Sequence, residues 1–237
     1  KIIIISIVLF IIFVIPGLSL ILFWREIYEV QNVLLPIGFN KDWLHPKYIL
    51  FNIPILLSFF GFYLLPILII EFFEVEKKIF FKRYYKSFLS ALTIFIFLFY
   101  LGILDYLGNY TIGGGAILKL NYLIEKNNFI LLLIFASFGF SLLWRFLKED
   151  LISNAVIIFP MFIVYCFTHL LYQEYVEPLI LLMFFLVLKT HLQKIYFNNV
   201  SFSNLIFISY FVIYLLGTIY FKHFAFNTFE EWKIFLN

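Results

Sequence analysis

Three polar stretches in an otherwise apolar chain carry the residues that are suited to chemistry. The first contains Lys41, Asp42 and His45, shortly before an apolar run. Asp42 and His45 are three residues apart and would share one face of a helix. No second histidine stands at metal-ligand spacing, so the stretch does not predict a metal site. It is a candidate binding loop, and an interfacial loop anchored by Trp43 and Lys41 is the alternative.

The second stretch is rich in glycine and holds Gly113, Gly114, Gly115 and Lys119. Consecutive glycines let the backbone turn tightly and point its amides at an anion such as a phosphate, and Lys119 would add a positive charge. The stretch is not a P-loop, because the Lys-Ser/Thr ending is absent, and it lacks the spaced glycines and parallel strand of a dinucleotide site. A phosphate-binding loop and a plain flexible loop both remain open.

The third stretch interrupts a long apolar run and holds His169, Gln173, Tyr175 and Glu177. His169, Gln173 and Glu177 follow one another at intervals of four residues, which places them on one face of a helix. Because a charge at the bilayer centre costs about 3 kcal/mol on insertion scales, these residues mark a site or a reversal of the chain at the membrane surface. Helix capping accounts for Glu177 before Pro178, but not for the polar groups that precede it.

Membrane-spanning helices are the elements that must position these stretches. The chain is 64% hydrophobic with a mean hydropathy of +1.03, whereas a soluble domain is about 45–50% apolar. Several apolar runs reach the roughly 20 residues that cross a bilayer, and none alternates like a strand of a membrane barrel. We expect an all-α polytopic bundle in one domain over residues 1–237. The seven expected helices cover residues 2–24, 48–70, 88–106, 129–146, 152–171, 178–191 and 204–221.

The distribution of Lys and Arg among alternate loops predicts the orientation of the bundle. One face collects ten of these residues and the other seven, with the excess concentrated in residues 71–86. We expect the richer face in the cytoplasm and the three polar stretches, each in a loop or turn, on the outer face. This topology accounts for the net charge of +3 and indicates no nucleic-acid partner. The single cysteine, Cys166, excludes an internal disulfide and a cysteine metal site.

In their order along the chain, the three stretches resemble the C-terminal portion of bacterial GT-C membrane glycosyltransferases. Those enzymes take sugars from polyprenyl-phosphate carriers and include relatives of the protein mannosyltransferases. The resemblance rests on Pro36, Phe39 and His45, on Gly113 to Gly115 with Leu118, and on Gln173, Tyr175, Glu177 and Pro178. Glu174 departs from the pattern, because many relatives have a basic residue there.

The resemblance implies transfer of a sugar from a polyprenyl-phosphate carrier to an extracytoplasmic acceptor, at the outer side of a bacterial inner membrane. Lys41, His45 and the triplet Gly113–Gly115 would stabilise the leaving phosphate, and Gln173 and Glu177 would line the sugar or acceptor pocket together with Tyr175. The catalytic carboxylate of the family lies in an earlier outward loop. We therefore expect a fragment whose N-terminal spans and catalytic residue lie upstream, and no cofactor is evident.

The sequence leaves two other functions open: a transporter and a non-catalytic membrane subunit. A transporter usually carries ionisable groups near the middle of its spans. Here the acids and bases gather near the expected span ends, which favours a site at the membrane surface. The sugar, the acceptor and the oligomeric state are not specified by the sequence.

Overall fold

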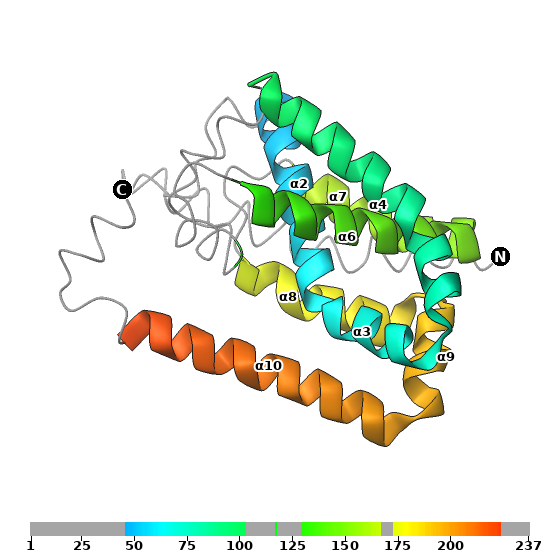
Figure 1. Cartoon of the computed structure of the whole chain (residues 1–237). Helices are drawn as coiled ribbons and strands as arrows, with labels where there is room; N and C mark the ends of the chain where they lie inside the picture. The colour runs from blue at the N-terminus through cyan, green and yellow to red at the C-terminus, as the bar shows by residue number, and fades with distance from the viewer. Residues whose placement is uncertain (1–45, 103–116, 118–128, 167–172, 224–237) are drawn as a thin grey trace, which may run out of the picture. The chain divides into compact units, whose positions relative to one another are not determined.

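A computed structural model describes residues 46–102, 117, 129–166 and 173–223 of the chain (Figure 1). All regular secondary structure within these ranges is helical, which confirms the all-α prediction for this part of the chain. The helices are α2 (Pro46–Tyr63), α3 (Leu65–Glu74), α4 (Lys77–Tyr100), α6 (Ile130–Glu149), α7 (Leu151–Cys166), α8 (Gln173–Leu182), the π-helix η2 (Met183–Val187), α9 (His191–Asn198) and α10 (Val200–His223).

The described helices supply two to four candidate membrane spans, and this part of the chain does not account for the seven that were expected. Helices α6 and α10 are each long and apolar enough to cross a bilayer. Two further spans arise only if bent pairs of helices are counted as one. These pairs are Asn52–Tyr63 with Leu65–Glu74, bent by 49°, and Val176–Val187 with His191–Asn198, bent by 84°. The expected helix at 2–24 lies outside the described ranges.

The expected helix at 48–70 is broken at Leu64 into α2 and α3. Pro66 stands in the first turn of α3, and a proline has no N–H to donate to a carbonyl of the preceding turn. The chain therefore changes direction at Leu64 before the helix resumes. Hydropathy does not register this break, because apolar residues continue on both sides of it.

Two other predicted helix boundaries are wrong. Helix α4 begins at Lys77 rather than at residue 88, because lysine and arginine are good helix formers even where they lower the hydropathy. The helix expected at 178–191 begins instead at Gln173, and the helical segment ends at Val187. It ends there because Leu188 is extended, and Thr190 then starts α9 with a capping box closed by Gln193.

Helices α2 and α6 form the most extensive helix pair in the described bundle. Their backbones meet at two glycines. A Cβ atom on Gly61 would lie 2.0 Å from the carbonyl oxygen of Phe135, and one on Gly139 would lie 1.8 Å from that of Leu57. Small residues that let two backbones approach are the usual basis of helix packing in a membrane, where apolar burial alone gives little driving force.

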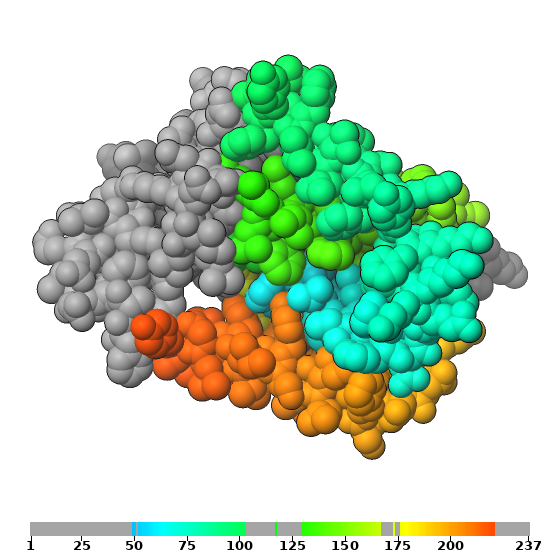
Figure 2. Space-filling model, in the orientation of Figure 1, coloured from blue at the N-terminus to red at the C-terminus, as the bar shows by residue number. Residues whose placement is uncertain are grey.

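Helix α10 lies along the surface and packs on α3 and α9 (Figure 2). Only 6% of the residues in its most apolar stretch are buried. The helix exposes large side chains such as Leu205, Ile213 and Leu216. A 24-residue helix that shows this much apolar surface is compatible with contact to lipid. The described helices are thus compatible with an integral membrane protein.

Candidate functional site

The hydroxyl of Tyr63 is the centre of a polar cluster inside the apolar bundle. It donates a hydrogen bond to Oε2 of Glu177 at 2.8 Å and accepts one from Nε2 of Gln173. The same Gln173 nitrogen lies 2.8 Å from the hydroxyl oxygen of Tyr214. A carboxylate, an amide and two phenols are therefore joined in one network, which we call the Tyr63 cluster.

Three helices hold the Tyr63 cluster in place. Gln173 and Glu177 lie one turn apart on α8, Tyr63 is the last residue of α2, and Tyr214 comes from α10. Aromatic rings surround Tyr63, with Phe211 stacked on its ring at a centroid distance of 6.1 Å. The side chain of Tyr63 is fully buried and that of Gln173 almost so. Because buried polar groups need hydrogen-bond partners, these contacts fix one arrangement of the four side chains.

The Tyr63 cluster lies at one end of α2 and of α8 and within the length of α10. Leu188 follows Gln173 by 15 positions, and Tyr214 follows Val200 by 14. At 1.5 Å per helical residue, each path places the cluster about 20 Å from the end of the bundle where α9 begins. The hydrocarbon core of a bilayer is about 30 Å thick. A turn was expected at residues 172–177. From Gln173 onward the chain is helical instead, because Gln173 is the first residue of α8.

Most of the other residues predicted to bind substrate lie outside the described ranges. They are Lys41, Asp42, His45, Gly113, Gly114, Gly115, Lys119 and His169. Tyr175 belongs to α8. Pro46 begins α2, and 17 residues of helix, or about 25 Å, separate it from Tyr63. The expectation that His45 and Glu177 face one pocket stays a prediction.

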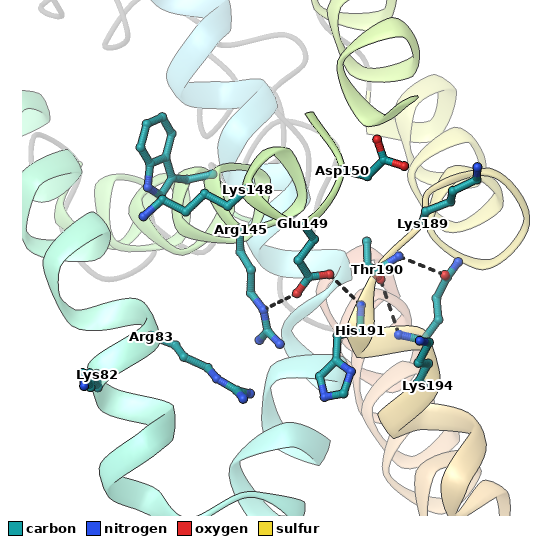
Figure 3. Close-up of a pocket in the computed structure, with 12 residues that line it drawn as sticks. Lys82, Arg83, Arg145, Lys148, Glu149, Asp150, Lys189, Thr190, His191 and Lys194 are labelled. Carbon is teal, nitrogen blue, oxygen red and sulfur yellow. Dashed lines mark hydrogen bonds and ion pairs between the residues drawn. The ribbon is translucent and has the colours of Figure 1, made fainter. Parts of the chain in front are cut away.

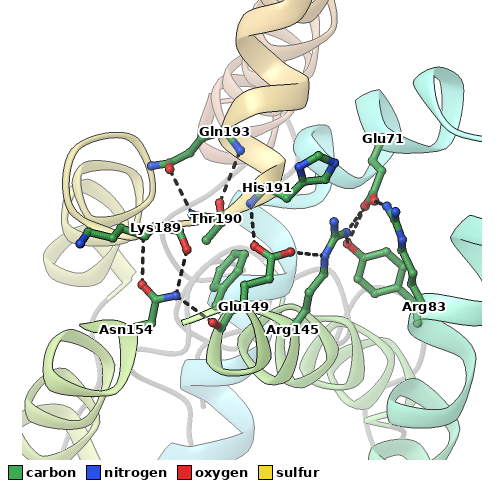
Figure 4. Close-up of polar contacts among 11 residues, drawn as sticks. Glu71, Arg83, Arg145, Glu149, Asn154, Lys189, Thr190, His191 and Gln193 are labelled. Carbon is green, nitrogen blue, oxygen red and sulfur yellow. Dashed lines mark hydrogen bonds and ion pairs between the residues drawn. The ribbon is translucent and has the colours of Figure 1, made fainter. Parts of the chain in front are cut away.

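A second polar network lies toward the end of the bundle where α9 begins, on α3, α4 and α6, and is centred on Glu71 of α3 (Figure 4). The carboxylate of Glu71 is fully buried. Its Oε1 accepts from Nη1 of Arg83 at 2.6 Å, and its Oε2 accepts from the hydroxyl of Tyr84 at 2.6 Å and from Nη1 of Arg145 at 2.5 Å. Both carboxylate oxygens are thus bound by charged or polar donors, which offsets the cost of burying the charge.

Glu149 links this network to the start of α9. Its Oε1 accepts from Nε of Arg145 at 2.9 Å, and its Oε2 accepts from the backbone N–H of His191 at 2.6 Å. An anion next to the first backbone N–H groups of a helix is stabilised by the helix dipole. Nearby, the side chain of Asn154 bonds the backbone N–H and carbonyl of Lys189, so the link before α9 is held in position.

A cavity of about 870 Å³ opens at this end of the bundle (Figure 3). We call it the basic pocket, because two carboxylates, Glu149 and Asp150, share its lining with six lysines and arginines. Those six cations are Lys82, Arg83, Arg145, Lys148, Lys189 and Lys194. They come from α4, α6, the link before α9, and α9 itself.

From the sequence, these six cations predicted only the orientation of the bundle in the membrane. They did not predict a pocket. Counting charges in alternate loops does place them at one membrane face, and the structure gathers all six around one cavity. The cavity itself has no sequence signal, because its lining comes from α4, α6 and α9, which are far apart in the chain. Glu71 is the residue that could have drawn attention, since it is the first charged residue after the apolar run that begins at Ile53.

The described residues contain no group of three His, Cys, Asp or Glu side chains that could hold a metal ion. The chain matches no protein-family model, no curated protein and no solved structure.

Proposed function

We propose that the chain is part of a membrane glycosyltransferase that takes a sugar from a polyprenyl-phosphate carrier, and that the Tyr63 cluster forms one wall of its substrate pocket. The convergence of Gln173 and Glu177 on one hydroxyl carries this proposal. The resemblance to the GT-C enzymes is strongest at these two residues. An ionisable side chain inside a membrane bundle is by default a candidate for function rather than packing.

The chemistry of the cluster suits a carbohydrate ligand. Sugar hydroxyls both donate and accept hydrogen bonds, and the carboxylate of Glu177, the amide of Gln173 and the phenols of Tyr63 and Tyr214 supply matching groups. The aromatic rings around Tyr63 supply apolar faces for the C–H surface of a sugar ring. In this proposal the cluster binds the sugar and takes no part in the reaction itself.

The test is photo-crosslinking of the full chain in nanodiscs to a short polyprenyl-phosphate-linked mannose that carries a diazirine. We expect saturable labelling that unlabelled donor displaces. Glu177→Gln and Tyr63→Phe should each reduce labelling about tenfold, because a hydrogen bond to a charged group contributes roughly 1.5–3 kcal/mol. The matched control is Glu74→Gln, which changes an exposed glutamate of α3 and should leave labelling unchanged. Equal labelling of all variants would contradict the proposal.

Transport is the second candidate, and the position of the Tyr63 cluster at a helix break favours it. Tyr63 is the last residue of α2, at the break between α2 and α3. Helices interrupted near the middle of the membrane form the binding sites of many transporters. Uptake of labelled free sugars into proteoliposomes separates the two functions, because a glycosyltransferase gives no accumulation and a transporter gives accumulation that Glu177→Gln reduces.

A further inference from the structure

The basic pocket includes cations that carboxylates of the described residues do not neutralise. Glu71 is occupied by Arg83, Tyr84 and Arg145, and Glu149 by Arg145 and the start of α9. Within the described ranges, the ammonium groups of Lys82, Lys189 and Lys194 form no ion pair with a carboxylate.

The remaining groups around the pocket leave this excess of positive charge in place. Asp150 accepts a hydrogen bond from the backbone of Ser153 at the start of α7, and Lys148 lies over the ring of Trp144 at 5.2 Å. Cations of like sign that surround one cavity repel one another, and a bound anion relieves that repulsion. The lining of the pocket thus presents more positive charge than its own acids balance.

One anion of the protein itself, the carboxylate of Glu149, is already bound in the pocket. The carboxylate of Glu149 lies between the guanidinium of Arg145 and the backbone N–H of His191 (Figure 4). A helix start next to arginine and lysine side chains is a common arrangement for binding phosphate. In Figure 3, Lys189 and Lys194 approach from one side of this corner and Lys82 and Arg83 from the other.

We propose that the basic pocket binds a ligand that carries two or more phosphate charges, through Lys82, Lys189 and Lys194 together with Arg83. Six cations and two carboxylates line this cavity of about 870 Å³, and the excess of positive charge matches the several charged oxygens of a diphosphate or a phosphomonoester headgroup. The exposed Trp144 on the rim suits the headgroup level of a bilayer. The ligand is therefore a soluble diphosphate or the phosphate headgroup of an anionic lipid, and both present the same chemistry.

Calorimetric titration with inorganic pyrophosphate tests the soluble form of the ligand. The full chain is placed in nanodiscs of phosphatidylcholine only, at low salt. The test variant is Lys189→Gln with Lys194→Gln, two exposed side chains of the pocket, and the matched control is Lys77→Gln with Lys78→Gln, two exposed lysines outside the lining. We expect one saturable site that the test variant weakens about tenfold or more and that the control leaves unchanged.

Native mass spectrometry tests the lipid form of the ligand. The chain is extracted from mixed vesicles of phosphatidic acid and phosphatidylcholine, and we expect preferential retention of phosphatidic acid that the same test variant abolishes. A second variant, Lys82→Gln with Lys148→Gln, removes charge from the opposite wall and should act in the same direction. Either result supports the pocket and identifies its source of phosphate. Absence of both kinds of binding, or an equal loss in the control variant, would overturn the proposal, and neither measurement depends on glycosyl transfer.

Discussion

Glu71 connects three helices through one side chain. Its carboxylate is fully buried and forms ion pairs with arginines from two other helices. The free energy of unfolding depends on such a network mainly when a single member is removed. Replacing all members by apolar groups is often tolerated, whereas removal of one partner leaves an unpaired charge in the interior. The side chain of Arg145 is only 10% exposed, so it has little access to water as a substitute partner.

Glu71→Gln should therefore destabilise the fold by about 3–5 kcal/mol, the usual cost of breaking a buried ion pair. The matched control is Glu74→Gln, on the same helix but exposed, which should change stability by less than about 0.5 kcal/mol. Thermal unfolding in detergent measures both. Similar melting temperatures for the two variants would show that the network around Glu71 contributes little to stability.

Part of the chemistry at this scale could be predicted from the sequence. The four-residue spacing predicted that Gln173 and Glu177 would share a helical face, and both contact Tyr63. Tyr63 itself was not singled out, because it is one of 16 tyrosines and lies in an apolar run without a motif. Its role depends on where α2 ends and on how α8 crosses it, and local sequence contains neither fact.

At the scale of helices, the crossing of α2 and α6 determines how closely the bundle packs. Gly61 and Gly139 lie opposite one another, and the amide nitrogen of each is within 3.0 Å of the position that a Cβ atom on the other would occupy. A side chain at either position cannot be accommodated by rotation of a neighbouring side chain, because the clashing atoms belong to the backbone.

Gly139→Ala should push α2 and α6 apart and lower stability by about 1–3 kcal/mol, which is typical of overpacking. Gly217→Ala is the control, because a Cβ atom at Gly217 of α10 would meet no atom within 4 Å. That change should be neutral or stabilising by up to about 1 kcal/mol, since alanine is the better helix former. Thermal unfolding in detergent and folded yield compare the two variants. An equal loss of stability in both variants would show that the crossing of α2 and α6 is not the cause.

The extent of the predicted helices was correct where apolar runs have no interruption and wrong elsewhere. The predicted helix at 129–146 corresponds closely to α6, and the helix at 204–221 falls within α10. The errors occurred at the break near Leu64 and at the turn between η2 and α9, where backbone chemistry and capping override hydropathy. Composition establishes that helices are present, but it does not establish where each one bends.

At the scale of the whole molecule, basic residues that are far apart in the chain gather at one end. Lys82 of α4, Lys148 of α6 and Lys194 of α9 all line the basic pocket. The count of lysine and arginine in alternate loops assigns the same residues to one membrane face. We predict that this end of the bundle faces the cytoplasm.

Cysteine labelling in intact cells tests that orientation. Cys166, the single native cysteine and a buried one, is first replaced by alanine. New cysteines at Lys78 and Lys194 should resist a membrane-impermeant maleimide from outside, and one at Lys119 should react. Permeabilised cells provide the control, because all three positions should then react. The reverse pattern would invert the orientation and place the basic pocket outside.

The order in which the Glu71 network is synthesised has a consequence for how the protein enters the membrane. Arg83 follows Glu71 by only 12 residues, whereas Arg145 follows it by 74. Because the chain is made from its N-terminal side, the carboxylate of Glu71 has one countercharge available soon after it emerges, and its second arrives only with α6. The short loop between α3 and α4 therefore gives the nascent chain an early partner for its buried acid. The ion pairs of Glu71 are complete once α6 brings Arg145 to the same carboxylate.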